Sequence, residues 1–175
     1  LVIGTGIIGL LSAVMARIAG ASYIAIIGRN TARNNKAIEM GDAEDVFSSK
    51  DTDLINKLIK SSNGGFDKVI DTAVSEDTLN TDIMAAVSGG KIVLVGVNYA
   101  KFPILSALIV GRELNIVGSI AYTSEEFDDC MALIEKGKID LEKYASVPIK
   151  LEGAQEAFER LSSGVNQDVK ILIKP

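Results

Sequence analysis

The sequence predicts an α/β fold: a doubly wound, mostly parallel six-stranded sheet, followed by a short C-terminal tail. Two observations support this fold. Apolar runs with the length of buried strands alternate with stretches that have the length and pattern of helices. The first apolar run, residues 1–3, leads directly into Gly4-Thr5-Gly6-Ile7-Ile8-Gly9, and a helix-forming stretch rich in small residues follows it. Because parallel strands are joined by right-handed crossovers, this alternation places ligands at the carboxyl ends of the strands.

The glycine segment has the spacing of a dinucleotide-binding turn. In such a turn the first glycine, Gly4, permits the tight passage from strand to helix, Gly6 lets the backbone approach a pyrophosphate, and Gly9 lets helix and strand pack closely. The amides of Ile7 and Ile8 then face the anion at the start of the helix. A strand precedes this motif, and a helix and a second strand follow it. The sequence therefore favours a Rossmann domain over a glycine-rich turn that binds no nucleotide.

The remaining elements follow in regular order. Capping residues mark the starts of helices, as at Asn30 or Thr31 and at Ser75, and Gly20 and Gly41 mark the ends. Strands buried on both faces read as continuous apolar runs. Strands are expected at residues 1–3, 23–27, 45–47, 68–71, 91–97 and 114–120, and helices at 10–19, 31–40, from 51 or 52 to a loop at 61–65, and at 75–87, 105–110 and 124–135.

The regular alternation stops near residue 138. Residues 139–146 look like a connection, a short strand is expected at 147–150, a helix at 151–161, and a last segment at 169–173. We therefore divide the chain into a dinucleotide-binding domain, residues 1–137, and a C-terminal tail, residues 138–175. The chain also opens inside an apolar strand, which leads us to expect that it is part of a longer protein.

The composition argues against several classes of partner. The 175 residues carry a net charge of −5, which argues against binding to nucleic acid or to an anionic membrane surface. The sequence has no apolar run long enough to span a bilayer. The single cysteine, Cys130, cannot form an internal disulfide, which fits a reducing, cytoplasmic location, and we expect it to serve packing on a helix.

The chain contains no histidine. This absence excludes a Ser-His-Asp triad, the histidine acid–base residue of hydroxyacid dehydrogenases, and any metal site with a histidine ligand among these residues. One cysteine cannot form a thiolate cluster either. We therefore expect no catalytic residue and no metal ligand in this chain.

Six segments of the chain resemble the C-terminal half of zinc-dependent medium-chain alcohol and polyol dehydrogenases. They are the glycine motif at residues 2–9 and the segments 33–41, 66–71, 89–96, 113–118 and 151–158, in the order that the family has them. Together they cover nearly the whole chain and are far more specific than the glycine motif alone. Within the family, residues 118–137 look closest to sorbitol, threonine and butanediol dehydrogenases.

The resemblance implies that two domains share the reaction. In this family an N-terminal GroES-like catalytic domain supplies the zinc ligands, and the C-terminal tail crosses back to that domain. Zinc polarises the oxygen of a small alcohol or polyol, and a hydride passes between its carbon and a nicotinamide dinucleotide. On this resemblance the chain is the cofactor-binding half of the enzyme. Zinc would belong to the intact protein but would not be bound by this chain, which we expect to be inactive alone.

The resemblance also assigns cofactor contacts residue by residue. Three of these assignments have a simpler alternative: Gly96 and Val97 could only end a strand, and Lys170 could only be a solvated lysine. The matched positions are Gly4, Gly6, Ile7, Ile8 and Gly9 for the pyrophosphate turn, Gly28, Arg29, Asn30 and Arg33 for the adenosine ribose, Ala73 and Val74 for the loop after strand four, where the family more often has a glycine, Gly96, Val97, Asn98, Ile120 and Ala121 for the nicotinamide, and Lys170 for the pyrophosphate.

The end of the second predicted strand favours NADP over NAD. NAD-specific turns place an Asp or Glu there, about 20 residues beyond the glycine motif, to accept a hydrogen bond from the ribose 2′-OH. Gly28 occupies this position, Arg29 follows it directly, and Arg33 lies one helical turn further on. A guanidinium group can bind the 2′-phosphate through two parallel charge-assisted hydrogen bonds. The alternative is a tolerant site that also accepts NAD, with Arg29 stacked on adenine and Arg33 solvated.

Two other functions share part of this pattern. A zinc-independent relative such as a quinone oxidoreductase would have the same cofactor half and would differ only in its N-terminal domain. A nucleotide-sensing module without enzyme activity would be a complete small domain with an acidic residue at position 28, where this chain has glycine. We therefore favour the dehydrogenase.

The sixth predicted strand, residues 114–120, is apolar, and the extended segment 101–103 precedes it. An uncovered edge strand invites pairing with another chain. We therefore expect a homodimer or tetramer with a sheet that continues across a two-fold axis. The alternative is an edge blunted by Lys101 and Pro103.

Overall fold

The computed structural model describes residues 1–163 and 168–175, so residues 164–167 of the predicted tail lie outside the described residues. Six strands form one sheet in the order β3-β2-β1-β4-β5-β6, and each neighbouring pair is parallel. This is the strand order of dinucleotide-binding α/β domains, in which the direction of winding reverses between β1 and β4. The predicted fold class is confirmed.

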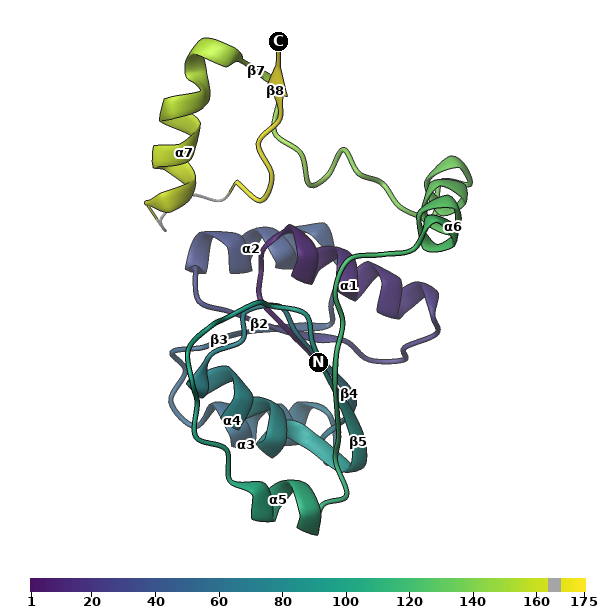
Figure 1. The fold of residues 1–175 in the computed structure, drawn as a ribbon, viewed down its shortest axis with the longest axis vertical. Coiled ribbons are helices and arrows are strands. Elements are labelled where there is room, and N and C mark those ends of the chain that lie inside the picture. Colours follow the sequence, from purple (N-terminus) through teal and green to yellow (C-terminus); the bar gives the residue numbers. More distant parts are fainter. Residues whose placement is uncertain (164–167) are drawn as a thin grey trace.

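The helices of the two halves lie on opposite faces of this sheet: α1 and α2 on one face, and α3, α4 and α5 on the other (Figure 1). Right-handed crossovers require this arrangement, because the chain crosses the sheet in one direction from β1 to β3 and in the other from β4 to β6. The strands are β1 (Val2–Ile3), β2 (Ala25–Gly28), β3 (Asp45–Ser48), β4 (Phe66–Asp71), β5 (Ala86–Leu94) and β6 (Asn115–Gly118), and the helices are α1 (Ile7–Ile18), α2 (Thr31–Met40), α3 (Leu54–Ser61), α4 (Glu76–Ala85) and α5 (Ser106–Gly111).

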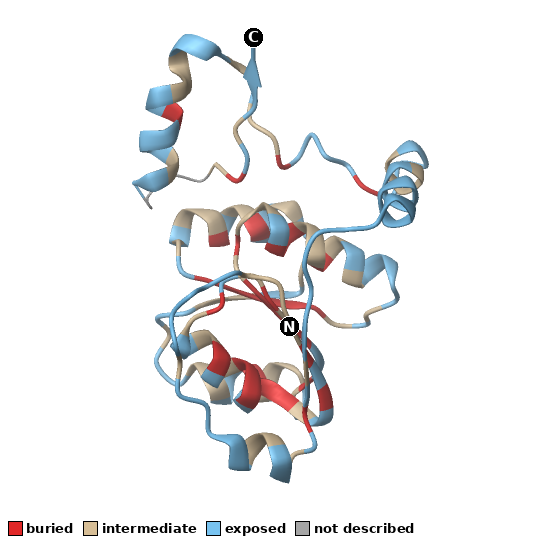
Figure 2. Ribbon diagram, viewed as in Figure 1, coloured by how far each residue is buried: buried red, intermediate tan, exposed pale blue. Residues whose placement is uncertain are grey.

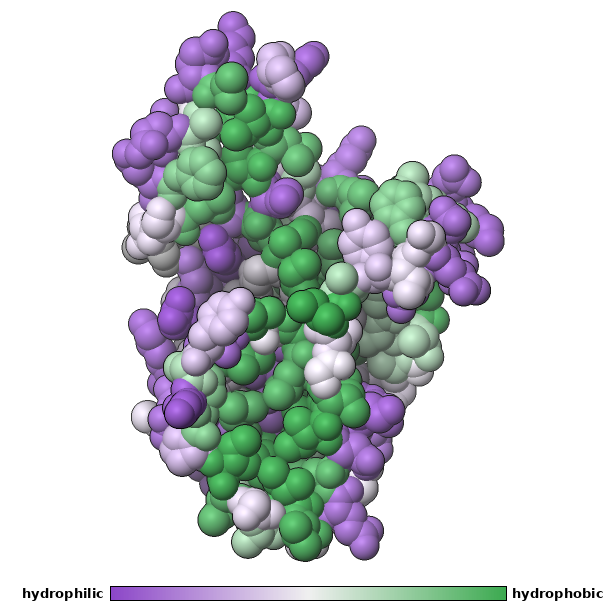
Figure 3. Space-filling view, viewed as in Figure 1, coloured by the Kyte–Doolittle hydropathy of each residue, from purple (hydrophilic) through white to green (hydrophobic). Residues whose placement is uncertain are grey.

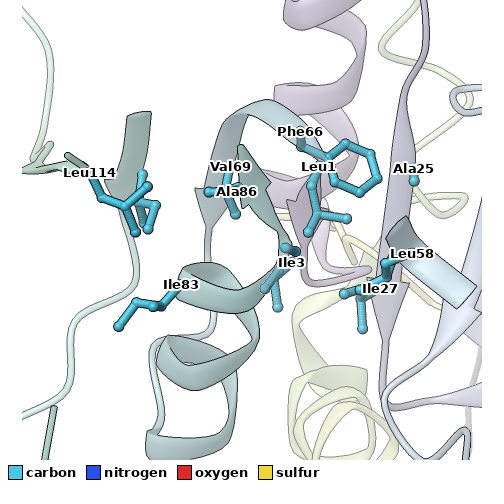
Figure 4. Close-up of a cluster of buried hydrophobic side chains, with 12 residues drawn as sticks. Leu1, Ile3, Ala25, Ile27, Leu58, Phe66, Val69, Ile83, Ala86 and Leu114 are labelled. Carbon is cyan, nitrogen blue, oxygen red and sulfur yellow. The ribbon is translucent and has the colours of Figure 1, made fainter. Parts of the chain in front are cut away.

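Alternate residues of the central strands point into two hydrophobic cores, one on each face. Leu1 and Ile3 lie in the core between the sheet and α3 and α4 (Figure 4). Val2, between them, lies in the core beneath α1 and α2, and on β2 the neighbours Ile26 and Ile27 divide in the same way. A strand with side chains buried on both faces has no polar alternation, which explains the continuous apolar runs of the sequence.

Capping residues predicted both ends of α2 correctly, whereas the predicted start of α3 was wrong by two or three residues. The side chain of Asn30 accepts a hydrogen bond from the Arg33 backbone N–H at 3.0 Å, which caps α2 as predicted. Gly41 ends α2 in the left-handed conformation, with φ 71°. Helix α3 begins at Leu54 rather than at residue 51 or 52, because Asp53 has φ 65° and cannot be part of a right-handed helix.

The predicted boundary between the fourth helix and the fifth strand was wrong. α4 ends at Ala85 instead of residue 87, and β5 begins at Ala86 and ends at Leu94 instead of spanning 91–97. Arg112 explains the early helix end. Its guanidinium donates to the carbonyl of Ile83 at 2.6 Å and also to that of Ala86, which satisfies the last free carbonyls of α4.

The tail extends from the domain and touches it at few points. It follows α6 (Ser124–Glu135) and contains a short sheet formed by the parallel strands β7 (Ile149–Lys150) and β8 (Ile173–Lys174), the turn η1 (Leu151–Gly153) and α7 (Ala154–Ser162). Most of its side chains are exposed (Figure 2). Tyr144 is an exception: it is 2% exposed, and its hydroxyl donates to a carboxylate oxygen of Asp42 at 2.8 Å. Together with Val169, it joins the core beneath α1 and α2.

Two further findings bear on expectations from composition. Cys130 on α6 is exposed, so the expectation that it serves packing was wrong. Among the helices of the described residues, none has both the length and the apolar character that crossing a membrane requires.

Candidate cofactor-binding site

A cavity of about 1010 Å³ opens at the carboxyl ends of β1 and β4, where the winding of the sheet reverses. Doubly wound sheets bind their ligands in this crevice, and the volume is at the upper end of the usual range for ligand pockets. The structure brings most of the predicted site residues together here. Those that line the cavity are Gly4, Gly6, Ile7, Ile8, Gly9, Arg29, Asn30, Arg33, Ala73, Val74 and Asn98.

The three glycines of the turn have three different geometries. Gly4 has φ 117°, a conformation that favours glycine, and its N–H donates to the Ile27 carbonyl at 2.8 Å. A Cβ atom on Gly9 would lie 2.0 Å from the Gly4 carbonyl oxygen, so only glycine permits this packing of α1 on the turn. Gly6 has open space around it, because a Cβ atom there would meet nothing within 4 Å. Its backbone can therefore be approached by a ligand.

The start of α1 presents free backbone donors to the cavity. Gly6 is the N-cap residue, and no side chain of the described residues caps the helix at this point. The first amides of a helix have no partner within the helix, and the helix dipole adds partial positive charge there. Ile7 and Ile8 both line the cavity. This arrangement can bind the phosphate groups of a dinucleotide.

Two arginines lie at the end of the cavity formed by β2 and α2. Arg29 is exposed and Arg33 is half-buried, and both line the cavity. Within residues 1–163 and 168–175 neither forms an ion pair, and the buried Nε atom of Arg33 has no hydrogen-bond partner. A buried guanidinium N–H without a partner is costly unless a ligand satisfies it. The geometry therefore fits an anionic group at this end.

The loop after β4 is held in place from both sides. One carboxylate oxygen of Asp71 accepts hydrogen bonds from the backbone N–H groups of Ala73, at 2.8 Å, and Val74, at 2.9 Å. The side-chain amide of Asn98 donates to the Val74 carbonyl at 3.0 Å. Val74 has φ 40°, which is rare for a β-branched residue. This strained conformation explains why the position suits the glycine that the resemblance associates with it.

A second buried carboxyl group lies behind this loop, and the sequence analysis did not single it out. Asp82 of α4 and Asp71 are both 0% exposed. Burial, and then the negative charge of Asp71 and a hydrogen bond to it, raise the pKa of Asp82 to about 9. Asp82 is therefore protonated at neutral pH and can donate to Asp71, whose second carboxylate oxygen has no other partner among the described residues. The available signal was its place beside Leu79 and Ile83 on the buried face of a predicted helix.

Six predicted contact residues do not line the cavity. Gly28 is buried beneath it, and Gly96 packs so closely that a Cβ atom would lie 2.9 Å from the Thr72 backbone. Val97 and Ile120 are 67% and 84% exposed. The others are Ala121 and Lys170, both exposed, and the roles assigned to all six stay predictions.

Polar residues to which the sequence analysis assigned no cofactor contact also line the cavity. They come from the glycine turn, the loop after β3, the segment between β4 and α4, and the first turns of α4. They are Thr5, Ser49, Thr72, Ser75, Asp77, Thr78, Asn80 and Thr81.

The described part of the chain does not offer a zinc site. No three His, Cys, Asp or Glu residues among residues 1–163 and 168–175 are grouped so that they could hold a metal ion. Three or four such side chains are needed for a catalytic or structural zinc.

The parallel sheet and the glycine turn at its switch point define a dinucleotide-binding domain. Comparison with known proteins then places the chain more narrowly. The sequence profile of the zinc-binding dehydrogenase family matches residues 8–136, and the chain belongs to this family.

Individual relatives agree with this placement. The chain is 32% identical over its whole length to (R,R)-butanediol dehydrogenase of Neisseria gonorrhoeae, covering 49% of that protein. It is 29% identical over 99% of its length to sorbitol dehydrogenase of Rattus norvegicus, covering 48% of it. A crystal structure of a zinc-binding dehydrogenase from Sinorhizobium meliloti 1021 bound to NADP superposes with a TM-score of 0.86, at 28% identity, over 99% of this chain and 51% of that one. The chain spans about half the length of the curated relatives it matches.

Proposed function

We propose that this chain is the cofactor-binding half of a zinc-dependent alcohol or polyol dehydrogenase, which transfers a hydride between a secondary alcohol and NAD(P). The observation that carries this proposal is the uncapped start of α1, opening into a cavity of about 1010 Å³ at the switch point of the sheet. The dehydrogenase relatives support the class of reaction. We further propose that residues 138–175 pack with the catalytic domain of the intact protein, and that the protein is cytoplasmic.

The residues of this chain would bind and orient the dinucleotide, which supplies the acceptor or donor of the hydride. The amides of Ile7 and Ile8 would bind the pyrophosphate. Asp71 and Asn98 hold the loop of Val74 against the cavity through the hydrogen bonds described above. This fixed loop would form one wall of the site, so that the nicotinamide is presented in one orientation. The zinc and the alcohol would be held by the other half of the enzyme.

The cofactor is proposed to be NADP, with Arg29 and Arg33 on its 2′-phosphate. We expect saturable binding of NADPH, tighter than that of NADH, when its fluorescence is titrated with the chain at fixed salt. Arg29→Ala should weaken NADPH binding by about 10- to 100-fold, because a hydrogen bond to a charged group is worth about 1.5–3 kcal/mol. It should leave NADH binding nearly unchanged.

Arg17→Ala is the matched control, since Arg17 pairs with Glu44 and does not line the cavity. If the unmutated chain binds neither nucleotide, the proposed function is wrong. If it binds NADH more tightly, only the preference is wrong. If Arg29→Ala keeps the full preference, the phosphate contact moves to Arg33, and Arg33→Ala is then expected to remove it.

We expect this chain alone to show no alcohol oxidation. The reason is that the described residues provide neither a metal site nor a histidine near the cavity. The measurement is NADPH and NADH formation by the purified chain with zinc, cofactor and a panel of polyols. Turnover above the rate without protein would place the reaction within this chain and would contradict the proposal.

The intact protein is proposed to be a homodimer or tetramer that uses the β6 edge. β6 is the edge strand of the sheet. Val117 on β6 is 41% exposed, and Val110 on the preceding helix α5 is 77% exposed. Figure 3 shows apolar surface gathered over this end of the molecule. We expect sedimentation at micromolar concentration to show a dimer, and Val110→Asp to convert it to a monomer. Ile38→Asp, at a residue of α2 that is 58% exposed, should leave the dimer intact. A parent chain that sediments only as a monomer would contradict the proposed dimer.

A further inference from the structure

The space beside Gly28 is filled by two other side chains. Gly28 ends β2 at the position where NAD-specific turns have an acidic residue. A Cβ atom on Gly28 would lie 1.9 Å from the side-chain oxygen of Asn34 and 2.6 Å from both the hydroxyl and the methyl group of Thr5. Real contacts of this kind are not shorter than about 3 Å, so no side chain fits at residue 28 while Asn34 and Thr5 keep their positions.

Asn34 is not free to move away. It is buried on the inner face of α2, and its side-chain amide donates to the Gly28 carbonyl at 3.0 Å and to the Phe47 carbonyl at 3.4 Å. Its side-chain oxygen accepts from the Thr5 hydroxyl at 3.2 Å. One side chain thus joins β2, β3 and the glycine turn. Any movement of Asn34 would leave buried polar groups without partners.

We infer that Asn34 and Thr5 are specificity-determining residues for the dinucleotide, because together they keep a carboxylate out of the ribose position at residue 28. This inference rests on the proposed function. The inference adds that the packing of Asn34 and Thr5 behind Gly28 excludes an acidic residue, so residue 28 alone does not determine the specificity. The adenosine end therefore stays open to a 2′-phosphate, and Arg29 and Arg33 meet no competing negative charge from β2.

The inference predicts that Gly28→Asp alone does not create an NAD site. In the parent chain this change should lower Tm by about 5 °C or more and weaken binding of both nucleotides, because the new side chain collides with Asn34. In the background Thr5→Ala/Asn34→Ala the same change should be accommodated. There it should shift the ratio of NADPH to NADH affinity by about tenfold or more toward NADH, since the carboxylate accepts from the 2′-OH and repels a phosphate.

The control is Gly153→Asp, because Gly153 lies away from the cavity and the β6 edge, has an ordinary φ of −86°, and a Cβ atom there would lie 3.6 Å from its nearest neighbour, on Ile149. It should leave Tm and the affinity ratio unchanged. A Gly28→Asp chain that keeps the Tm of the parent and prefers NADH by itself would overturn the inference. The inference would also be overturned if Gly28→Asp lowered Tm equally in the parent chain and in the Thr5→Ala/Asn34→Ala background.

Failure of the proposed function would look different. If the parent chain binds neither nucleotide, the Tm comparison with Gly28→Ala still tests the packing. The decrease in Tm caused by Gly28→Ala must be larger in the parent chain than in the Thr5→Ala/Asn34→Ala background. If that background does not fold, Asn34→Ala alone removes the 1.9 Å contact and must reduce the loss. A loss that is the same in both backgrounds would overturn the inference.

Discussion

Replacing Gly9 with alanine is expected to lower the free energy of unfolding by about 3 kcal/mol or more and to abolish dinucleotide binding. The new Cβ atom would lie 2.0 Å from the carbonyl oxygen of Gly4 and 2.9 Å from its carbonyl carbon. These are backbone atoms of a turn that a hydrogen bond from Gly4 to Ile27, 2.8 Å long, ties to β2. The turn cannot move away without breaking this bond, so α1 must separate from β1. Urea denaturation followed by circular dichroism measures the loss.

Gly6→Ala provides the matched control three residues away. Gly6 has an ordinary backbone conformation, with φ −84°, and nothing lies within 4 Å of a Cβ atom there. Its stability should stay within about 0.5 kcal/mol of the parent. NADPH binding should nevertheless weaken, because the methyl group occupies the surface where the pyrophosphate approaches. A Gly9→Ala chain as stable as the parent would show that α1 does not pack on the turn as closely as described.

The features that the sequence predicted well depend on local chemistry. The glycine turn, the Asn30 cap and the left-handed Gly41 are each determined within about one turn of helix, so neighbouring residues suffice to recognise them. The doubly wound, parallel character of the sheet follows from the alternation of elements and the handedness of crossovers. These rules need no knowledge of which side chains meet across the fold.

The features that were missed depend on contacts between distant segments. Arg112 ends α4 by binding carbonyl groups that precede it by more than twenty residues in the chain, and no local pattern announces this contact. In the sequence, Asn34 is indistinguishable from the other polar residues of its helix. Only the folded structure shows its hydrogen bonds with Gly28 and Thr5. The predicted contacts at Ile120 and Lys170 came from resemblance to a longer protein, and they do not line the cavity in this chain.

Asp82→Asn is expected to stabilise the chain relative to the parent by an amount that grows as pH rises from about 4 to about 9. Burial, and then the charge of Asp71, raise the pKa of Asp82 from 3.8 to about 9 in the folded state. Between these values the folded chain keeps the proton that the unfolded chain has released. The folded state then binds more protons, so stability falls with pH, by at most about 1.4 kcal/mol per pH unit. Asparagine has no proton to lose and can still donate to Asp71.

The comparison must be made as a difference between variant and parent. Burial also lowers the pKa of the Leu1 amino group, from 8.0 to about 5. For this group the unfolded state binds more protons between those values, so its contribution to stability rises with pH and opposes that of Asp82. Both proteins share the part of the Leu1 contribution that comes from burial and from Asp67, and subtraction removes that part. The smaller interaction between the Leu1 amino group and the Asp82 carboxylate is lost in Asp82→Asn and stays in the difference. We expect a difference near zero at pH 4 and of about 2 kcal/mol or more at pH 8. Asp77→Asn, at an exposed position of the same helix, should show no such trend.

The same pair connects stability to the site, because Asp71 also holds the loop of Ala73 and Val74 through its other oxygen. Ionisation of Asp82 above about pH 9 places two negative charges behind this loop, and repulsion between them should displace Asp71. Hydrogen exchange at the Ala73 and Val74 amides should then accelerate in the parent beyond the intrinsic pH effect, and NADPH binding should weaken. In Asp82→Asn the exchange rates, corrected for the intrinsic pH effect, should stay constant over this pH range, and so should the affinity for NADPH. A stability difference between variant and parent that does not change with pH would show that the two carboxyl groups do not share a proton.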